Sequence, residues 1–160
     1  MRGGRIPAAP LCLERKFGMK VKDIMHSPAE SCDPGTRICD VAGKMNRHDC
    51  GIIPIVMDRK VLGVVTDRDI AMRIVAAARE PREMCAMDAM SIRVVTVNEN
   101  ATIEDCCGLM GQHKLRRLPV VDQNDELVGV VSMADIAKNS DPHETGRLMK
   151  LISEPEEAVV

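Results

Sequence analysis

The chain contains an internal repeat, and this repeat limits the possible fold more than any other feature of its 160 residues. Residues of the first half recur in the second half at a constant offset of 65 positions. They are Asp23, Met25, Ile38, Asp40, Gly43, Met45, His48, Pro54 and Val56, which recur as Asp88, Met90, Ile103, Asp105, Gly108, Met110, His113, Pro119 and Val121. Because the period is long and there are only two copies, it predicts two similar units related by a pseudo-twofold axis rather than a solenoid.

One residue is inserted in a turn, after which the offset becomes 66. The residues that recur beyond this point are Gly63, Val64, Val65, Asp69 and Ile70, matched by Gly129, Val130, Val131, Asp135 and Ile136, while Ser132 stands in the place of Thr66. The match therefore spans most of both copies and fixes which residues are equivalent.

Each copy has the pattern β-α-β-β-α, which places the chain in the α+β class. In the first copy, apolar periodicity predicts a helix over 36–47 with Thr36 as its N-cap. Runs of β-branched residues predict strands over 52–57 and 61–66, and an alanine-rich segment predicts a helix over 67–79. A short extended piece is expected over 29–32.

The second copy repeats this order. We expect an extended piece over 94–97, a helix over 101–113, strands over 117–121 and 127–132, and a helix over 133–138. A last amphipathic helix should run from about 141 to 152. The chain then divides into a flexible N-terminal extension (1–18), a first domain (19–79), a linker (80–85), a second domain (86–140), and a C-terminal helix with an acidic tail (141–160).

Composition excludes several classes of function. The formal net charge is −2, and Phe17 is the only aromatic residue, so the chain has neither the basic charge nor the stacking platforms of a nucleic-acid binder. The early apolar stretch is short and broken by Pro7 and Pro10, so we expect no signal sequence and no membrane span.

Seven cysteines are an odd number and contain no C-x-x-C pair, which predicts neither a disulfide framework nor a zinc site. We interpret them as reduced and mostly buried in a cytoplasmic protein, with Cys106 and Cys107 facing the core. His48 and His113 should lie at helix C-termini, where the helix dipole stabilises a proton, and His48 with Cys50 is too small a set to name a metal site. We expect no metal, no required cofactor and, since no nucleophile–base set can be assembled, no catalytic residues.

The motifs of both copies resemble the CBS (cystathionine β-synthase) domain family. Residues 21–25, 51–56 and 63–70 resemble the family's opening segment, its first core strand and its nucleotide-ribose motif, and 116–122 and 129–136 are the second-copy counterparts. The resemblance covers about residues 20–138. It implies a tandem pair, or Bateman module, packed through its sheets, with two clefts that take AMP, ADP, ATP or S-adenosylmethionine, and it implies a homodimer.

Thr66 and Asp69 are the first candidate ligand residues. The resemblance implies that the Asp69 carboxylate accepts ribose hydroxyls while the Thr66 hydroxyl helps to hold a phosphate. A simpler interpretation is a capping box, since Ser or Thr followed three residues later by an acid is a common helix start. The two interpretations are compatible.

Basic residues of the second copy complete the predicted cleft. Arg116 and Arg117 are expected to reach the phosphates of a nucleotide whose ribose lies on Asp69, assisted by Arg68 and Lys114; the alternative is a solvated basic turn. The copy-one equivalents of the two arginines are Gly51 and Ile52, so the cleft around Ser132 and Asp135 lacks this clamp. We therefore expect an asymmetric module in which the cleft around Asp135 is weak, empty or suited to a less charged adenosyl ligand.

Together, these residues predict a non-catalytic regulatory module that binds an adenosine nucleotide and signals to a separate partner protein. Two alternatives remain open. One is a ligand-free dimerisation or interaction protein, and the other is a thiol or metal sensor, which the number of cysteines favours and their spacing does not.

Overall fold

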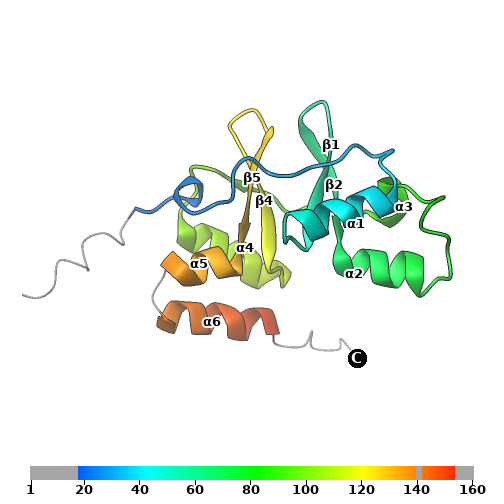
Figure 1. Cartoon of the computed structure of the whole chain (residues 1–160). Coiled ribbons are helices and arrows are strands. Elements are labelled where there is room, and N and C mark those ends of the chain that lie inside the picture. Colours follow the sequence, from blue (N-terminus) through cyan, green and yellow to red (C-terminus); the bar gives the residue numbers. More distant parts are fainter. Residues whose placement is uncertain (1–17, 140–141, 154–160) are drawn as a thin grey trace, which may run out of the picture.

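The structure, a computed structural model, describes residues 18–139 and 142–153. It is an α+β fold in which two repeats of similar element order lie side by side (Figure 1). The first repeat contains η1 (Val21–Asp23), α1 (Ile38–Arg47), β1 (Ile52–Met57), β2 (Lys60–Thr66), α2 (Asp67–Ile70) and η2 (Ala71–Val75). The second contains α3 (Ala86–Ala89), β3 (Val97–Asn98), α4 (Ile103–His113), β4 (Arg117–Val121), β5 (Leu127–Ser132) and α5 (Met133–Asn139), and α6 (Pro142–Ser153) follows.

The fold class, the four hairpin strands and the C-terminal helix predicted from the sequence are confirmed. Most of the predicted N-terminal extension and the acidic tail lie outside the described residues. The division into domains at 19–79, 80–85 and 86–140 stays a prediction.

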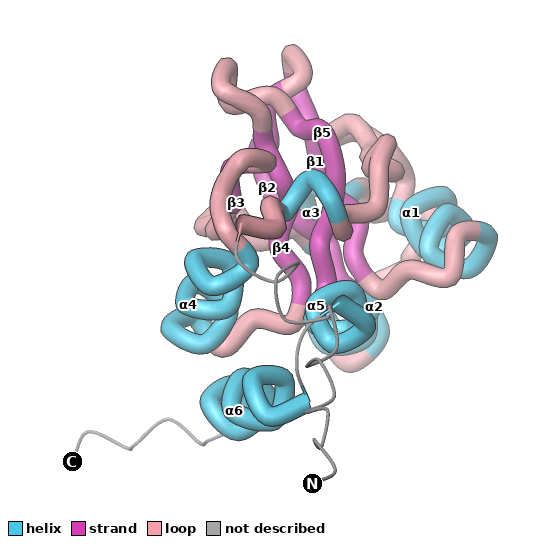
Figure 2. The backbone as a smooth tube through the Cα atoms, turned by 90° about the vertical axis from the view of Figure 1, so that its left-hand side faces the viewer, coloured by secondary structure: helices cyan, strands magenta, loops and turns pink. Residues whose placement is uncertain are grey.

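The centre of each repeat is an antiparallel hairpin built from β-branched residues. β1 pairs with β2 and β4 pairs with β5, and each first strand has one register shift at the same place, after Ile55 and after Val120. The tips of the two hairpins meet where the Leu127 amide donates to the Arg59 carbonyl (2.9 Å). Figure 2 shows the strands of both repeats gathered in the middle, with α1 and α4 on opposite sides.

The extended piece that precedes each first helix behaves differently in the two repeats. In the second repeat β3 pairs in parallel with β4. In the first repeat Cys32 alone forms a parallel bridge with Ile55, so the strand expected over 29–32 is not formed. The next amide that the parallel ladder needs belongs to Pro34, which has none, so pairing stops there.

The opening segments of the two repeats are exchanged. Val21 donates its amide to Ala101 (3.0 Å) and is fully buried in the core of the second repeat. Conversely, the Ala86 amide donates to Thr36 (2.7 Å), and Ala86 and Ala89 are buried in the core of the first repeat. Each core is thus completed by a segment that the sequence assigns to the other copy, and the repeats are interlocked.

The second core has one more component than the first. α6 packs against α4 and α5 and contributes Leu148 and Ile152 to this core (Figure 1). Both side chains are almost inaccessible to solvent, whereas Met149 and Leu151 of the same helix are about half exposed. In the part of the chain that the structure describes, no equivalent helix covers α1 and α2.

Three helix boundaries predicted from the sequence are wrong, and in the second repeat α4 begins at Ile103 rather than at 101, with Thr102 as its N-cap. α1 begins at Ile38 with Arg37 as N-cap, because the Thr36 carbonyl is engaged by Ala86 of the exchanged segment. The helix predicted over 67–79 ends earlier. After Ile70 it continues as the π-helix η2, and the chain leaves the helix through Ala78, whose φ is +53°.

The cysteines are less buried than predicted. Of the six that the structure describes, Cys32 and Cys106 are buried, Cys39 is exposed, and the other three, Cys50, Cys85 and Cys107, are half-buried; Cys12 lies outside the described residues. All six are free thiols. Cys106 does face the core as expected, and its burial raises the pKa of the thiol to about 12. Burial likewise raises the pKa of Cys32 and Cys50.

Residues 18–139 and 142–153 contain no candidate membrane-spanning helix. None of the helices there combines the length and the apolar character that crossing a bilayer requires.

Candidate functional site

A cavity of about 330 Å³ lies between the two repeats. Its apolar wall combines residues of both, namely Ile52 and Val64 of the first repeat with Val94, Val95, Leu115 and Pro119 of the second. Its polar lining consists of Thr66, Asp69, Ser91, Arg93, Arg116 and Arg117. The structure therefore brings together four of the eight site residues predicted from the sequence, Thr66, Asp69, Arg116 and Arg117.

Thr66 and Asp69 form a complete capping box at the start of α2. The Asp69 amide donates to Thr66 Oγ1 (3.1 Å), and Asp69 Oδ2 accepts from the Thr66 amide (2.9 Å) and the Thr66 hydroxyl (2.7 Å). The structural role inferred from the sequence is thus present, and Asp69 also lines the cavity. The cap holds the carboxylate in a fixed orientation, which a binding site requires.

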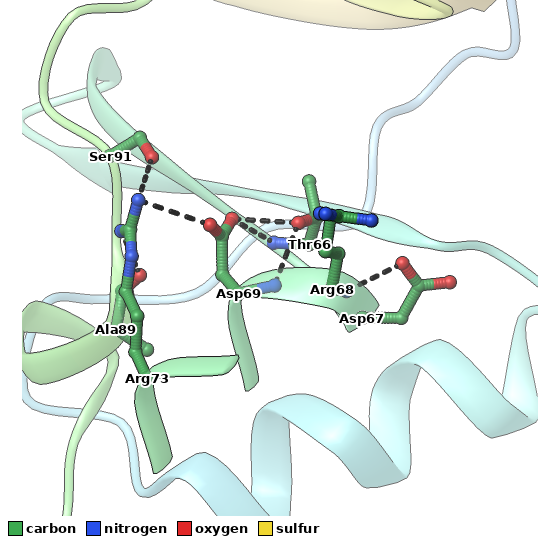
Figure 3. Close-up of polar contacts among 7 residues, drawn as sticks. All are labelled: Thr66, Asp67, Arg68, Asp69, Arg73, Ala89 and Ser91. Atoms are coloured by element: carbon green, nitrogen blue, oxygen red, sulfur yellow. Dashed lines mark hydrogen bonds and ion pairs between the residues drawn. The ribbon is translucent and has the colours of Figure 1, made fainter. Parts of the chain in front are cut away.

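Arg73, which was not among the residues predicted from the sequence, contacts this carboxylate from η2. Its Nη2 lies 3.2 Å from Asp69 Oδ1 and donates to Ser91 Oγ (2.9 Å), while its Nη1 donates to the Ala89 carbonyl (2.6 Å). Figure 3 shows the guanidinium group between Asp69 and the exchanged segment of the second repeat. The available signal was the i, i+4 spacing of Asp69 and Arg73 on one helix.

Three arginines line the same cavity as Asp69. Arg116 and Arg117 come from the start of β4, where the sequence placed them, and Arg93 from the loop before β3 is an addition. A Cβ atom on Gly51 would lie 3.1 Å from Arg117 Nη1 and 2.8 Å from Asp67 Oδ2. Gly51 of the first repeat therefore leaves room for the Arg117 guanidinium group of the second repeat. A larger side chain at position 51 would displace this group.

Four predicted site residues do not line this cavity: Arg68, Lys114, Ser132 and Asp135. Arg68 is exposed beside Asp67, and Lys114 caps the C-terminus of α4 with φ of +52°. Ser132 and Asp135 form a second capping box, with the Ser132 hydroxyl 2.6 Å from Asp135 Oδ2. They occupy the place in the second repeat that Thr66 and Asp69 occupy in the first. Their role as a second ligand site stays a prediction.

The described part of the chain holds no group of three or more His, Cys, Asp or Glu side chains arranged to bind a metal ion. His48 lies at the C-cap of α1 and His113 ends α4, as predicted. His48 Nδ1 lies 3.7 Å from a Glu30 carboxylate oxygen.

The interlocked repeats and the cavity between them define a tandem pair of CBS domains. The CBS domain profile matches residues 21–76 and 86–141, and the chain belongs to this family. Among similar proteins, the CBS domain-containing protein YhcV of Bacillus subtilis is 40% identical over 78% of this chain and 88% of its own length. Hypoxic response protein 1 of Mycobacterium tuberculosis is 33% identical over 84% of this chain and 94% of its own length.

Two solved structures add information on ligands of relatives. The crystal structure of Hypoxic Response Protein I, with a TM-score of 0.70 and 31% identity, covers 77% of this chain and all of the other, and holds two coordinated zinc ions. The CBS domain pair of protein MJ0100, with a TM-score of 0.67 and 27% identity, covers 76% of this chain and 94% of the other, and is in complex with 5′-methylthioadenosine and S-adenosyl-L-methionine.

Relatives that are enzymes match over a small part of their length. The inosine-5′-monophosphate dehydrogenase of Korarchaeum cryptofilum is 28% identical over 78% of this chain but only 24% of its own sequence. In such proteins the CBS pair is one part of a longer chain, whereas YhcV and hypoxic response protein 1 are matched over nearly their whole length.

Proposed function

We propose that this chain is a non-catalytic regulatory module that binds an adenosine nucleotide carrying phosphate in the cavity between its repeats. The observation that carries the proposal is the division of charge across that cavity. One carboxylate, Asp69, lies on the first repeat, and three guanidinium groups, Arg93, Arg116 and Arg117, lie on the second.

This arrangement suits the two ends of a nucleotide. A carboxylate accepts hydrogen bonds from ribose hydroxyls, and guanidinium forks match the geometry of phosphate oxygens. The apolar wall formed by Ile52, Val64 and Leu115 offers a surface for a flat base. Since one acid faces three bases, we expect AMP, ADP or ATP to bind more tightly than S-adenosylmethionine, which carries no phosphate.

Such a ligand would connect the two repeats, because its ribose and its phosphates contact different ones. Binding can shift the packing of the repeats only if the ligand favours one arrangement over another. A separate partner protein would detect the shift. We further propose that the protein acts in the cytoplasm.

A homodimer is part of this proposal. η2 presents an exposed apolar strip at i, i+1, i+4 and i+5, formed by Ala71, Met72, Val75 and Ala76. Met72 is 58% and Val75 65% exposed, and together with the two alanines they form a contiguous apolar surface, which is the kind that marks an interaction site. A second copy of the chain would cover this strip. Sedimentation analysis should show a dimer that Met72→Glu converts to a monomer, and a monomeric wild type would contradict this assembly.

Calorimetric titration with AMP, ADP, ATP, S-adenosylmethionine and adenosine tests the ligand. We expect saturable nucleotide binding, with Arg117→Met weakening AMP by about tenfold while adenosine affinity stays within about twofold. Arg47→Met, at the exposed end of α1 and outside the cavity lining, is the matched control. If protein shown to be free of copurified ligand binds none of the five, the interaction-protein alternative replaces this proposal.

A further inference from the structure

The contacts of Asp69 limit how many hydrogen bonds a ligand can make with it. A carboxylate has about four acceptor positions, two on each oxygen. Oδ2 already accepts two hydrogen bonds, from the amide and the hydroxyl of Thr66 (2.9 and 2.7 Å). Oδ1 has one ion-pair contact, with Arg73 Nη2 at 3.2 Å. One position on Oδ1 therefore stays open.

Asp69 is a lining residue of the cavity, so a ligand held there lies next to its carboxylate. Asp69 and Ser91 line the cavity, and Arg73 does not. The guanidinium group therefore contacts Asp69 from outside the cavity lining, and it is held there by the Ala89 carbonyl (2.6 Å) and the Ser91 hydroxyl (2.9 Å) (Figure 3). Because these anchors belong to the exchanged segment of the second repeat, Arg73 cannot leave Asp69 without breaking a contact between the repeats.

We propose that Arg73 is the positioning residue of the cavity: it leaves Asp69 a single acceptor position, so that the site recognises one of the two ribose hydroxyls. This inference rests on the proposed function. Thr66 Oγ1 donates its own proton to Asp69 and accepts from the Asp69 amide. The second hydroxyl therefore meets at best a neutral acceptor, and hydrogen bonds to neutral groups contribute less than those to charged ones.

The second repeat shows what the site would be without Arg73. Position 139, equivalent to 73, is an asparagine whose side chain donates to the Asp135 backbone carbonyl (2.8 Å) and not to its carboxylate. Among the described residues, Asp135 Oδ1 has no basic partner. The single open position is thus specific to the first repeat.

The test is calorimetric titration of the full chain with AMP, 2′-deoxy-AMP and 3′-deoxy-AMP. In the wild type, we expect loss of one hydroxyl to weaken binding about tenfold and loss of the other about twofold. In Arg73→Met both positions on Oδ1 are free, so the two deoxy analogues should bind within about twofold of each other. Arg73→Lys keeps a cation beside Oδ1 and should retain part of the inequality.

Arg79→Met is the matched control. Arg79 Nη2 lies 3.0 Å from Asp88 Oδ1, so it also connects the first repeat to the exchanged segment, but neither residue lines the cavity. This variant should keep the wild-type inequality between the two deoxy analogues.

Each outcome decides between the hypotheses. Equal losses for the two analogues in the wild type, or an inequality that persists in Arg73→Met, would overturn the role of Arg73 while leaving nucleotide binding intact. A wild type that binds none of the three nucleotides would overturn the proposed function itself. Thermal unfolding of each variant shows whether a lost signal reflects lost folding, and since Arg73 is 43% exposed, we expect little change.

Discussion

The two repeats place the same carboxylate in the same helix cap and then surround it with different partners. Asp69 Oδ2 accepts from Thr66 and Asp135 Oδ2 accepts from Ser132, and both amide contacts are 2.9 Å. The other oxygen of Asp69 is paired with Arg73, whereas the equivalent Asn139 contacts only backbone. A cap is a requirement of the local fold, so its presence in both repeats says little about binding.

The difference lies in what surrounds each cap. Three arginines of the other repeat line the same cavity as Asp69, whereas the copy-one equivalents of Arg116 and Arg117 are Gly51 and Ile52. The second repeat instead has additional packing, since α6 completes its core with Leu148 and Ile152. The two repeats thus differ in the charged groups around each cap and in the packing of each core, and four experiments can break or sharpen this comparison.

The largest expected effect is on stability. Leu148→Ala removes a side chain of α6 that is 3% exposed in the second core, and we expect the free energy of unfolding to fall by about 2–5 kcal/mol. Urea denaturation measures this. Met149→Ala, at a neighbouring position that is 49% exposed, should change it by less than about 0.5 kcal/mol. Similar losses from both variants would show that α6 does not stabilise the second repeat.

The next largest expected effect is on AMP affinity, and it distinguishes the carboxylate of Asp69 from that of Asp135. Asp69→Ala should weaken AMP binding by about tenfold to a hundredfold, because a charge-assisted hydrogen bond is lost. Asp135→Ala removes the same kind of cap and should weaken it less than about threefold. Each variant loses about 1 kcal/mol of stability with its cap, so the comparison is matched at the cap, although Asp69→Ala also loses the ion pair with Arg73. If the two lose AMP affinity equally, the asymmetry between the clefts is wrong.

A third experiment uses Cys106, whose first-repeat equivalent is Val41. The buried thiol has its pKa raised to about 12 from 9.0, so the folded state holds the neutral form. Its contribution to stability is complete below pH 9 and is lost as pH rises from 9 towards 12, at up to about 1.4 kcal/mol per pH unit.

Cys106→Val copies the first repeat and should reduce the dependence of unfolding free energy on pH in this range. Denaturation at a series of pH values measures the slope. At pH 7 the variant should differ from the wild type by less than about 1.5 kcal/mol, since the two side chains have similar volume. An unchanged slope above pH 9 would mean that Cys106 ionises as readily in the folded as in the unfolded chain.

The smallest expected effect is at the contact between the hairpins. Arg59 Nη2 lies 2.8 Å from Glu126 Oε2, but the Arg59 side chain is 77% exposed. Arg59→Ala should therefore change the free energy of unfolding by less than about 1 kcal/mol, as measured by urea denaturation at low and high salt. A larger loss would indicate that the tips, rather than the exchanged segments, hold the repeats together.

Several parts of the fold and site were predictable from particular residues. The offset of 65 residues predicted the duplication, and the β-branched runs at 52–57 and 117–121 predicted the first strand of each hairpin. The spacing of Thr66 and Asp69 predicted the helix cap. Arg116 and Arg117 were predicted because they closely precede Pro119, where the resemblance to CBS domains implies basic residues that reach a phosphate. Arg93 was missed because it lies in a loop without a local pattern, and Arg73 because an i, i+4 pair is common on any helix.

The sequence by itself determined the duplication, the order of the elements and the caps, because these depend on periodicity and on hydrogen bonds between near neighbours. Only the tertiary structure decided which core each opening segment completes, which helices α6 covers and which side chains meet across the cavity. These depend on contacts between residues far apart in the chain, as when Val21 pairs with Ala101, and such contacts leave no local pattern in the sequence.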